Sequence, residues 1–225
     1  MTEFVYLHGF ASGPSSQKAS AFKKKFKEIG ISIYIPDLEG GNFENMTLSS
    51  QLNIIFNLLN QLNSKEVCLI GSSMGGYLAS LVAELRDEVK AAYLIAPGFN
   101  FLDRWMNNVK LDFNDETSWK SKIPVFHYRY FETKYICSDI FKDAKNWGST
   151  SFNREIPSRI IHGIYDEVVP IDVSKKFIAS RPWCSLKELD SDHGLLSHLE
   201  WMPNDCMEFF KKLDLLSMKK KLKAD

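Results

Sequence analysis

The sequence predicts an α/β fold with a mostly parallel sheet of about six strands and helices on both faces. Short apolar runs typical of buried strands alternate with stretches in which apolar residues recur at helical spacing, and turn residues separate the two. Such alternation is typical of βαβ units, which place parallel strands side by side under covering helices. The chain has 225 residues, which is enough for one domain with a substantial core.

The expected elements follow one another in a simple order. Gly30 ends the first helix, whereas Pro36 and Pro97 end the second and fourth strands. Each strand is a short apolar run, and each helix has an apolar stripe. The expected strands are residues 4–8, 31–35, 66–70, 89–95, 158–162 and 185–189, and the expected helices are 19–29, 48–62, 77–85, 173–178 and 206–216.

The alternation breaks between residues 98 and 155. This stretch has 13 aromatic residues and no clean strand–helix order, although residues 125–131 are compatible with a strand and 138–146 with a short helix. We therefore divide the chain into an α/β core, residues 1–97 and 156–225, and an inserted cap, residues 98–155. We expect the cap to lie over the carboxyl ends of the strands, where open α/β sheets place their sites. Most of its rings should form a small core of their own, and a few should line a substrate pocket.

Composition and charge exclude several classes of protein. Lys+Arg and Asp+Glu both number 28, so nothing suggests a general nucleic-acid or membrane-surface partner. No apolar stretch has the length of a membrane span, and the first residues do not resemble a signal peptide. The cysteines have no paired or metal-like spacing, which favours a reducing, cytoplasmic compartment. We expect no metal and no cofactor, because no motif for either is found. The cysteines are Cys68, Cys137, Cys184 and Cys206.

The motif Gly71-x-Ser73-x-Gly75 stands between an apolar strand and an amphipathic helix. A serine at the tip of a tight strand-to-helix turn has a strained backbone and an exposed hydroxyl. Glycines two residues to either side leave room for the strand and the helix to pass closely. The positive end of the helix points at this site and favours developing negative charge. The pattern in this context predicts Ser73 as a nucleophile.

A serine hydroxyl is a poor nucleophile at neutral pH, so it needs a base and a group that orients the base. His193, in a loop just after the last strand, is the expected base, and His198 ranks second because it falls in or beside the final helical region. Asp166, just after the preceding strand, is the expected acid, and the adjacent Glu167 is the alternative if the turn faces it inward. The order Ser73, Asp166, His193 is typical of α/β-hydrolases.

Acyl transfer also needs N–H donors for the oxyanion of the tetrahedral intermediate. We expect one donor from the backbone of Met74, directly after the nucleophile, and the other from the backbone of Phe10, in the loop after an adjacent strand. His8 and His162, each followed by a glycine, are expected to shape turns. Asp192 is expected to shape the loop of the base.

Several stretches of the chain resemble a known family. On these stretches it resembles the α/β-hydrolase superfamily and, within it, the small bacterial esterases of the YqiA/YcfP-like group. The resemblance implies a compact serine hydrolase of carboxylic esters or acyl-thioesters, with Ser73 as nucleophile, His193 as base and Asp166 as acid. The stretches are Tyr6-Leu-His-Gly-Phe10 with Ser12-x-Pro14-x-Ser16-x-Lys18, Ile70-Gly-Ser-Ser-Met-Gly-Gly-Tyr77, His162-Gly-x-x-Asp166-Glu167-Val168, and Asp192-His193.

The sequence therefore predicts a hydrolase that forms an acyl-enzyme on Ser73 with a small acyl ester or thioester. The oligomeric state stays open between monomer and dimer. Two alternatives remain, because fold alone does not fix function. One is a lyase that uses the same three residues on a small carboxylic acid without an acyl-enzyme. The other is a small-molecule receptor with little turnover.

Overall fold

The computed structural model describes residues 2–109 and 122–216. Its main sheet has six strands in the order β2-β1-β3-β4-β7-β8, and every neighbouring pair is parallel. The predicted α/β class is confirmed, although the second strand has two residues instead of five and lies at the edge of the sheet. The strands are β1 (Glu3–Leu7), β2 (Ile33–Tyr34), β3 (Val67–Ser72), β4 (Val89–Ile95), β7 (Ser158–Gly163) and β8 (Cys184–Leu189).

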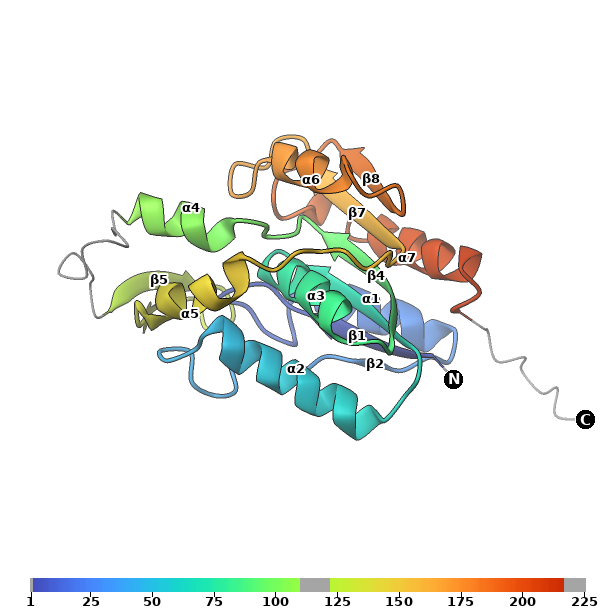
Figure 1. The fold of residues 1–225 in the computed structure, drawn as a ribbon, viewed down its shortest axis with the longest axis horizontal. Coiled ribbons are helices and arrows are strands. Elements are labelled where there is room, and N and C mark those ends of the chain that lie inside the picture. The colour runs from blue at the N-terminus through green and yellow to red at the C-terminus, as the bar shows by residue number, and fades with distance from the viewer. Residues whose placement is uncertain (1, 110–121, 217–225) are drawn as a thin grey trace, which may run out of the picture.

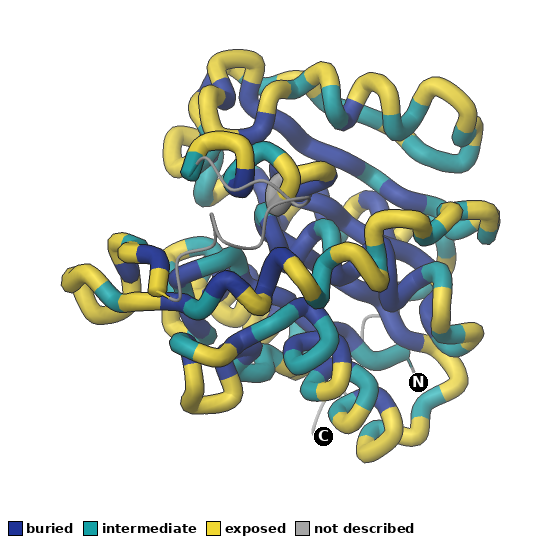
Figure 2. Tube along the Cα trace, turned by 60° about the vertical axis from the view of Figure 1, so that its left-hand side comes forward, coloured by how far each residue is buried: buried dark blue, intermediate teal, exposed yellow. Residues whose placement is uncertain are grey.

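Helices cover both faces of the sheet (Figure 1). Successive residues of a strand point to opposite faces, so Leu7 of β1 belongs to one hydrophobic cluster and Tyr6 to the other. The strands form the buried layer between more exposed helices (Figure 2). The face of Leu7 is covered by α2 (Leu48–Leu62), α3 (Met74–Leu85) and α6 (Ile171–Ile178), and the face of Tyr6 by α1 (Gln17–Glu28) and α7 (Trp201–Lys212).

The described part of residues 98–155 adds no strand to the main sheet. The strand considered at residues 125–131 ends at His127. There the N–H groups of Tyr130 and Phe131 both donate to the carbonyl of His127 and turn the chain into an antiparallel hairpin. Residues 110–121 of the expected cap lie outside the described residues. The elements of this stretch are α4 (Phe101–Asn108), β5 (Ile123–His127), β6 (Glu132–Ile136) and α5 (Asp139–Gly148), which extend together beyond one end of the sheet (Figure 1).

These inserted elements share the core of the sheet. Phe141 of α5 and Ile123 of β5 are buried in the same cluster as Leu7. We expected a small separate core here, but the apolar faces of the hairpin and of α5 pack directly onto the layer of α2 and α3. The hairpin and α5 are therefore fixed against the layer of α2 and α3.

The hairpin turn is also tied to the two loops that follow β1 and β2. These are the loops at the carboxyl ends of the strands, next to the turn between β3 and α3. A buried histidine–carboxylate pair, an exposed arginine–carboxylate pair and a backbone hydrogen bond make the connection. They are His127–Glu39 at 2.6 Å, Arg129–Asp37 at 2.7 Å and Tyr128 N–H to the carbonyl of Ala11 at 2.9 Å.

Three further features concern residues 2–109 and 122–216. No helix there is long and apolar enough to cross a membrane. No group of three or more His, Cys, Asp or Glu residues there is arranged to hold a metal ion. The four cysteines are free thiols.

Candidate active site

The turn between β3 and α3 holds Ser73 in a strained conformation. Its φ is +54° and its ψ is −120°, a region that costs a non-glycine residue about 1–3 kcal/mol. Four backbone hydrogen bonds hold Ser73 in this geometry. The Ser73 N–H donates to the carbonyl of Ile95 (2.8 Å), and the Ser73 carbonyl accepts from the N–H groups of Gly76 (2.9 Å), Tyr77 (3.2 Å) and Gly98 (2.8 Å).

The two glycines that flank Ser73 are needed because backbone atoms occupy the space of a side chain. A Cβ on Gly71 would lie 2.3 Å from the carbonyl oxygen of Gly75. A Cβ on Gly75 would lie 2.1 Å from the carbonyl oxygen of Leu7 in β1. The first contact is the close passage of strand and helix that the motif predicts. The second shows that α3 also passes close to the neighbouring strand.

The structure brings together the three side chains that the sequence singles out. His193 Nε2 lies 3.0 Å from Ser73 Oγ, and His193 Nδ1 lies 2.6 Å from Asp166 Oδ2. Each residue follows the carboxyl end of a different strand, β3, β7 or β8. An ionised carboxylate only accepts hydrogen bonds, so Nδ1 of His193 carries its proton and Nε2 is free to accept the proton of the Ser73 hydroxyl.

Four donors converge on the Asp166 carboxylate. Oδ1 accepts the backbone N–H groups of Val168 (2.9 Å) and Val169 (2.7 Å). Oδ2 accepts from His193 Nδ1 and also from His162 Nε2, at 3.0 Å. Burial by itself raises the pKa of a carboxyl, but the hydrogen bonds from His162 and His193 and the N–H of Val169 outweigh it and hold the pKa of Asp166 well below its ordinary value. The acid is therefore ionised wherever the protein is folded near neutral pH.

His162 makes a contact with the acid that the sequence did not indicate. We expected it to shape a turn, yet its fully buried ring joins Asp166 on one side and the buried hydroxyl of Ser174 in α6 on the other, at 2.8 Å. A continuous hydrogen-bonded chain thus runs from Ser174 through His162, Asp166 and His193 to Ser73. The available signal was the position of His162 four residues before the acid, at the end of the same strand.

Replacing His162 by phenylalanine should lower kcat about tenfold, because it removes one of the donors that orient the carboxylate. The conservative variant His162→Gln keeps an N–H donor and should recover part of the loss. Steady-state kinetics of the folded variants measures this. An unchanged kcat in both variants would show that the contact is structural only.

The loop after β1 runs beside the nucleophile. A Cβ on Gly9 would lie 3.4 Å from the Cβ of Ser73, so the backbone of Phe10 is close to the site. The Phe10 ring packs against Trp105 of α4, with centroids 5.0 Å apart. Met74 is the first residue of α3, where a helix has no carbonyl one turn earlier to accept the backbone N–H. Met74 thus directly follows the serine, and Phe10 directly follows the glycine that lies beside it.

His8 holds this loop from inside the protein. Its Nε2 accepts the N–H of Leu38 (3.0 Å), so the ring is neutral and Nδ1 donates to the carbonyl of Gly9 (2.9 Å). Burial lowers the pKa of His8, which favours the same neutral state. The ring shapes the turn, as the sequence suggested.

The other residues considered for the acid and the base do not join the hydrogen-bonded set of Ser73, His193 and Asp166. Glu167 is exposed, and it is Asp166 that contacts the base. Asp192 accepts the N–H of Leu195 (3.2 Å) and so shapes the loop that carries the base. His198 Nδ1 pairs with the hydroxyl of the neighbouring Ser197, at 3.0 Å.

A lysine of α1 lies near enough to the acid for the two charges to interact. Burial lowers the pKa of Lys18 to about 8, although the negative charges of Asp166 and Asp192 favour its protonated form. At neutral pH the Lys18 ammonium therefore places a positive charge near the acid and the loop of the base.

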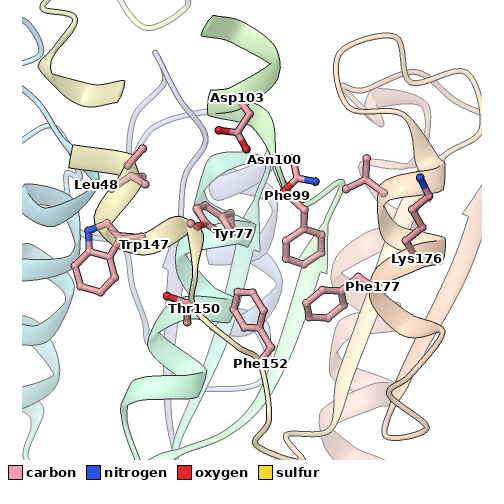
Figure 3. A pocket seen from close by; sticks show the side chains of 13 residues that line it. Leu48, Tyr77, Phe99, Asn100, Asp103, Trp147, Thr150, Phe152, Lys176 and Phe177 are labelled. Carbon is pink, nitrogen blue, oxygen red and sulfur yellow. The ribbon is translucent and has the colours of Figure 1, made fainter. Parts of the chain in front are cut away.

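A cavity of about 340 Å³ lies beside α3 (Figure 3). Aromatic rings supply most of its apolar lining, and polar side chains such as Thr150, Asp103 and Lys176 complete it. The three residues of the hydrogen-bonded Ser–His–Asp set do not line it. Burial, with a smaller contribution from the charge of Asp103, raises the pKa of the Tyr77 hydroxyl in this cavity to about 12. The rings are Tyr77, Phe99, Trp147, Phe152 and Phe177.

The topology and the serine turn define the α/β-hydrolase fold, and solved structures agree. Est1E from Butyrivibrio proteoclasticus superposes with a TM-score of 0.79 at 20% sequence identity, covering 96% of this chain and 89% of that one. The mouse alpha/beta hydrolase domain-containing protein 10 superposes with a TM-score of 0.75 at 20% identity, covering 94% and 90%. At these identities the likeness concerns the fold alone.

Residues 3–211 match the model of the family described as "Uncharacterised protein family (UPF0227)", and the chain belongs to this family. It is 30% identical over 206 residues to the "Putative esterase/lipase 2" of Mycoplasma genitalium, covering 79% of this chain and 76% of the relative. It is also 23% identical over 204 residues to the mitochondrial palmitoyl-protein thioesterase ABHD10 of Bos taurus, covering 85% of this chain and 66% of the relative. The family resemblance seen in the sequence is confirmed.

Proposed function

We propose that this chain is a serine hydrolase that cleaves carboxylic esters or acyl-thioesters through an acyl-enzyme on Ser73. The observation that carries the proposal is the hydrogen-bonded set Ser73–His193–Asp166, with contacts of 3.0 and 2.6 Å at the carboxyl ends of three strands. The general class, an ester hydrolase, agrees with relatives named as an esterase/lipase and a palmitoyl-protein thioesterase. The strained serine turn and the ionised acid support the finer statement.

In the acylation step, Ser73 Oγ attacks the acyl carbon while His193 Nε2 takes the hydroxyl proton across the 3.0 Å contact. Asp166 holds the proton on Nδ1 and stabilises the imidazolium that forms. As the tetrahedral intermediate collapses, His193 gives its proton to the leaving oxygen or sulfur, and the acyl group stays on Ser73.

The carbonyl oxygen becomes negative in the tetrahedral intermediate and needs donors. The backbone N–H groups of Met74 and Phe10 are the proposed pair, and the N-terminus of α3 adds favourable potential. Each such donor typically contributes about 3 kcal/mol to transition-state stabilisation. In deacylation, His193 accepts a proton from a water molecule that attacks the acyl-enzyme. His193 then returns this proton to Ser73 Oγ as the carboxylic acid leaves, which regenerates the hydroxyl.

We assign residues 98–155 as a cap on a core formed by residues 1–97 and 156–225. The Phe10–Trp105 ring contact and the hairpin contacts to the loops after β1 and β2 support this assignment. Through these contacts the cap would steady the loop that carries one oxyanion donor.

Fluorophosphonate labelling tests the proposal. The wild-type protein should form a single adduct on the peptide that contains Ser73, located by peptide mass spectrometry, and Ser73→Ala should form none. Ser72→Ala is the matched control, because the neighbouring serine is buried in β3 and should be dispensable for labelling. A folded wild-type protein without an adduct would contradict the proposal and favour a small-molecule receptor.

A further inference from the structure

We infer that the cavity beside α3 binds the acyl group of the substrate and that this group is apolar and of moderate length. The inference rests on the proposed function. It names the substrate class, which neither the family nor the names of the relatives specify for this chain.

Two residues that line the cavity, Tyr77 and Phe99, lie close in the chain to the hydrogen bonds that hold the backbone of Ser73. Tyr77 lies one helical turn after Ser73 and donates its N–H to the Ser73 carbonyl (3.2 Å). Phe99 directly follows Gly98, which donates its N–H to the same carbonyl (2.8 Å). A helical turn rises about 5.4 Å, a distance that a few methylene groups span. An acyl chain attached to Ser73 can therefore reach the cavity.

The floor of the cavity is made of packed aromatic rings (Figure 3). Phe99 and Phe177 stack with centroids 4.2 Å apart, and Phe152 packs edge-on against Phe177 at 5.5 Å. The Arg181 guanidinium lies over Phe177, 4.4 Å from the ring centroid. Such a floor favours an apolar group and offers no hydrogen-bond partner to a polar one.

The wall opposite the floor is fixed before any substrate binds. Trp147 of α5 donates its Nε1–H to Ser49 Oγ at 3.0 Å. Ser49, in the first turn of α2, donates its N–H and its hydroxyl to the Asp143 carboxylate at 2.7 and 2.5 Å. These bonds tie α5 to α2, so little ordering of the wall is needed on binding.

The cavity and the loop of His193 belong to opposite layers of the molecule. The loop of His193 packs through Leu195 into the cluster covered by α1 and α7. The cavity belongs to the opposite layer, with lining residues on α2, α3 and α6. Because His193 delivers its proton to the leaving group, the leaving group lies toward His193 and the acyl group toward the layer of the cavity.

The volume sets the expected length of the acyl group. About 340 Å³ is at the small end of ligand pockets, which suits a chain of roughly eight carbons or one aromatic ring. Burial of each methylene strengthens binding about fourfold. The value of kcat/KM should therefore rise from p-nitrophenyl acetate to p-nitrophenyl octanoate. Lys176 and Asp103 at the rim are exposed and keep the outer end of the cavity in contact with water.

Filling the cavity should lower this preference. Thr150→Trp places a large ring at one lining residue of the cavity, and Gly148→Trp adds a ring at a second, where an added Cβ meets no atom within 4 Å. In each variant the ratio of kcat/KM for octanoate to that for acetate should fall about tenfold. Ser149→Trp is the matched control, since exposed Ser149 does not line the cavity, and its ratio should equal that of the wild type.

A second pair of substrates tests whether the cavity binds the acyl part or the alcohol part of the ester. With ethyl acetate and octyl acetate the chain is on the alcohol, and the ratio of their kcat/KM values should be the same in all four proteins.

Circular dichroism shows which variants are folded, and the chain-length profile of the wild type is informative even if both filling variants fail to fold. A flat wild-type profile, an unchanged octanoate ratio in a folded filling variant, or a fall confined to octyl acetate would overturn the inference. A wild type inactive on every ester and unlabelled at Ser73 would instead reject the proposed function itself.

Discussion

Replacing Asp166 by asparagine should lower kcat about 10⁴-fold while the protein stays folded. An asparagine amide can donate a hydrogen bond to His193 Nδ1 and so favours the tautomer with its proton on Nε2. That tautomer cannot accept the proton of the Ser73 hydroxyl. The neutral amide also cannot stabilise the imidazolium of the transition state. Steady-state kinetics with p-nitrophenyl acetate measures the effect.

The control for this prediction is Glu167→Gln. Glu167 is the exposed neighbour that the sequence left open as an alternative acid, and its loss should change kcat by less than twofold. If Glu167→Gln were the severe variant and Asp166→Asn the mild one, the acid would have to be reassigned. Unfolding midpoints of both variants show whether a loss of activity comes from misfolding.

The Asp166 variant should also change how stability depends on pH. The pKa of Asp166 is lower in the folded protein than in the unfolded chain, where it is about 3.9. The charge therefore stabilises the folded state above that unfolded value, and this stabilisation is lost as the pH falls toward the lower folded value. Asp166→Asn has no such charge, so its free energy of unfolding should fall less steeply with acid than that of the wild type. Urea unfolding between pH 6 and pH 3 measures the difference.

The sequence predicts the sheet well because buried strands leave strong local signals. The runs around Val5, Leu69 and Ile160 are apolar and short, and all three pair in parallel as expected. The insertion left weaker signals. The turn at His127 has no glycine or proline to mark it, so the pattern did not show that β5 and β6 form a hairpin. Nor did the pattern show that Phe141 packs into the main core, because that contact depends on tertiary structure.

The residues of the site also divide into those that a local sequence pattern indicates and those whose contacts depend on tertiary structure. Ser73, Asp166 and His193 could be chosen because each stands in a loop after a strand, and parallel strands bring such loops to one edge. The contact of His162 with Asp166 could not be chosen, because a histidine at a strand end reads equally well as a turn residue. The Ser174 partner comes from α6, and no spacing rule links a helix serine to a strand histidine. Side chains that meet across elements without a shared motif are visible only in three dimensions.

Gly75→Ala should reduce kcat/KM at least 10²-fold and lower the free energy of unfolding by about 1–3 kcal/mol. The added Cβ would lie 2.1 Å from the carbonyl oxygen of Leu7 and 2.5 Å from that of His8, so α3 has to move away from β1. Moving α3 displaces the Met74 N–H and Ser73 together, because both belong to the turn that begins the helix. A shift of about 1 Å at a reacting group is enough for a loss of this size.

Denaturant unfolding and kinetics with p-nitrophenyl acetate check this prediction together. Gly148→Ala is the matched control for stability, because its Cβ meets no atom within 4 Å and alanine in a helix is favoured over glycine by up to about 1 kcal/mol. Its free energy of unfolding should therefore equal or exceed that of the wild type. A Gly75→Ala protein with wild-type kcat/KM and wild-type stability would mean that the close approach of α3 to β1 does not hold the nucleophile in place. A loss of activity without a loss of stability would instead place the whole effect on the geometry of the serine turn.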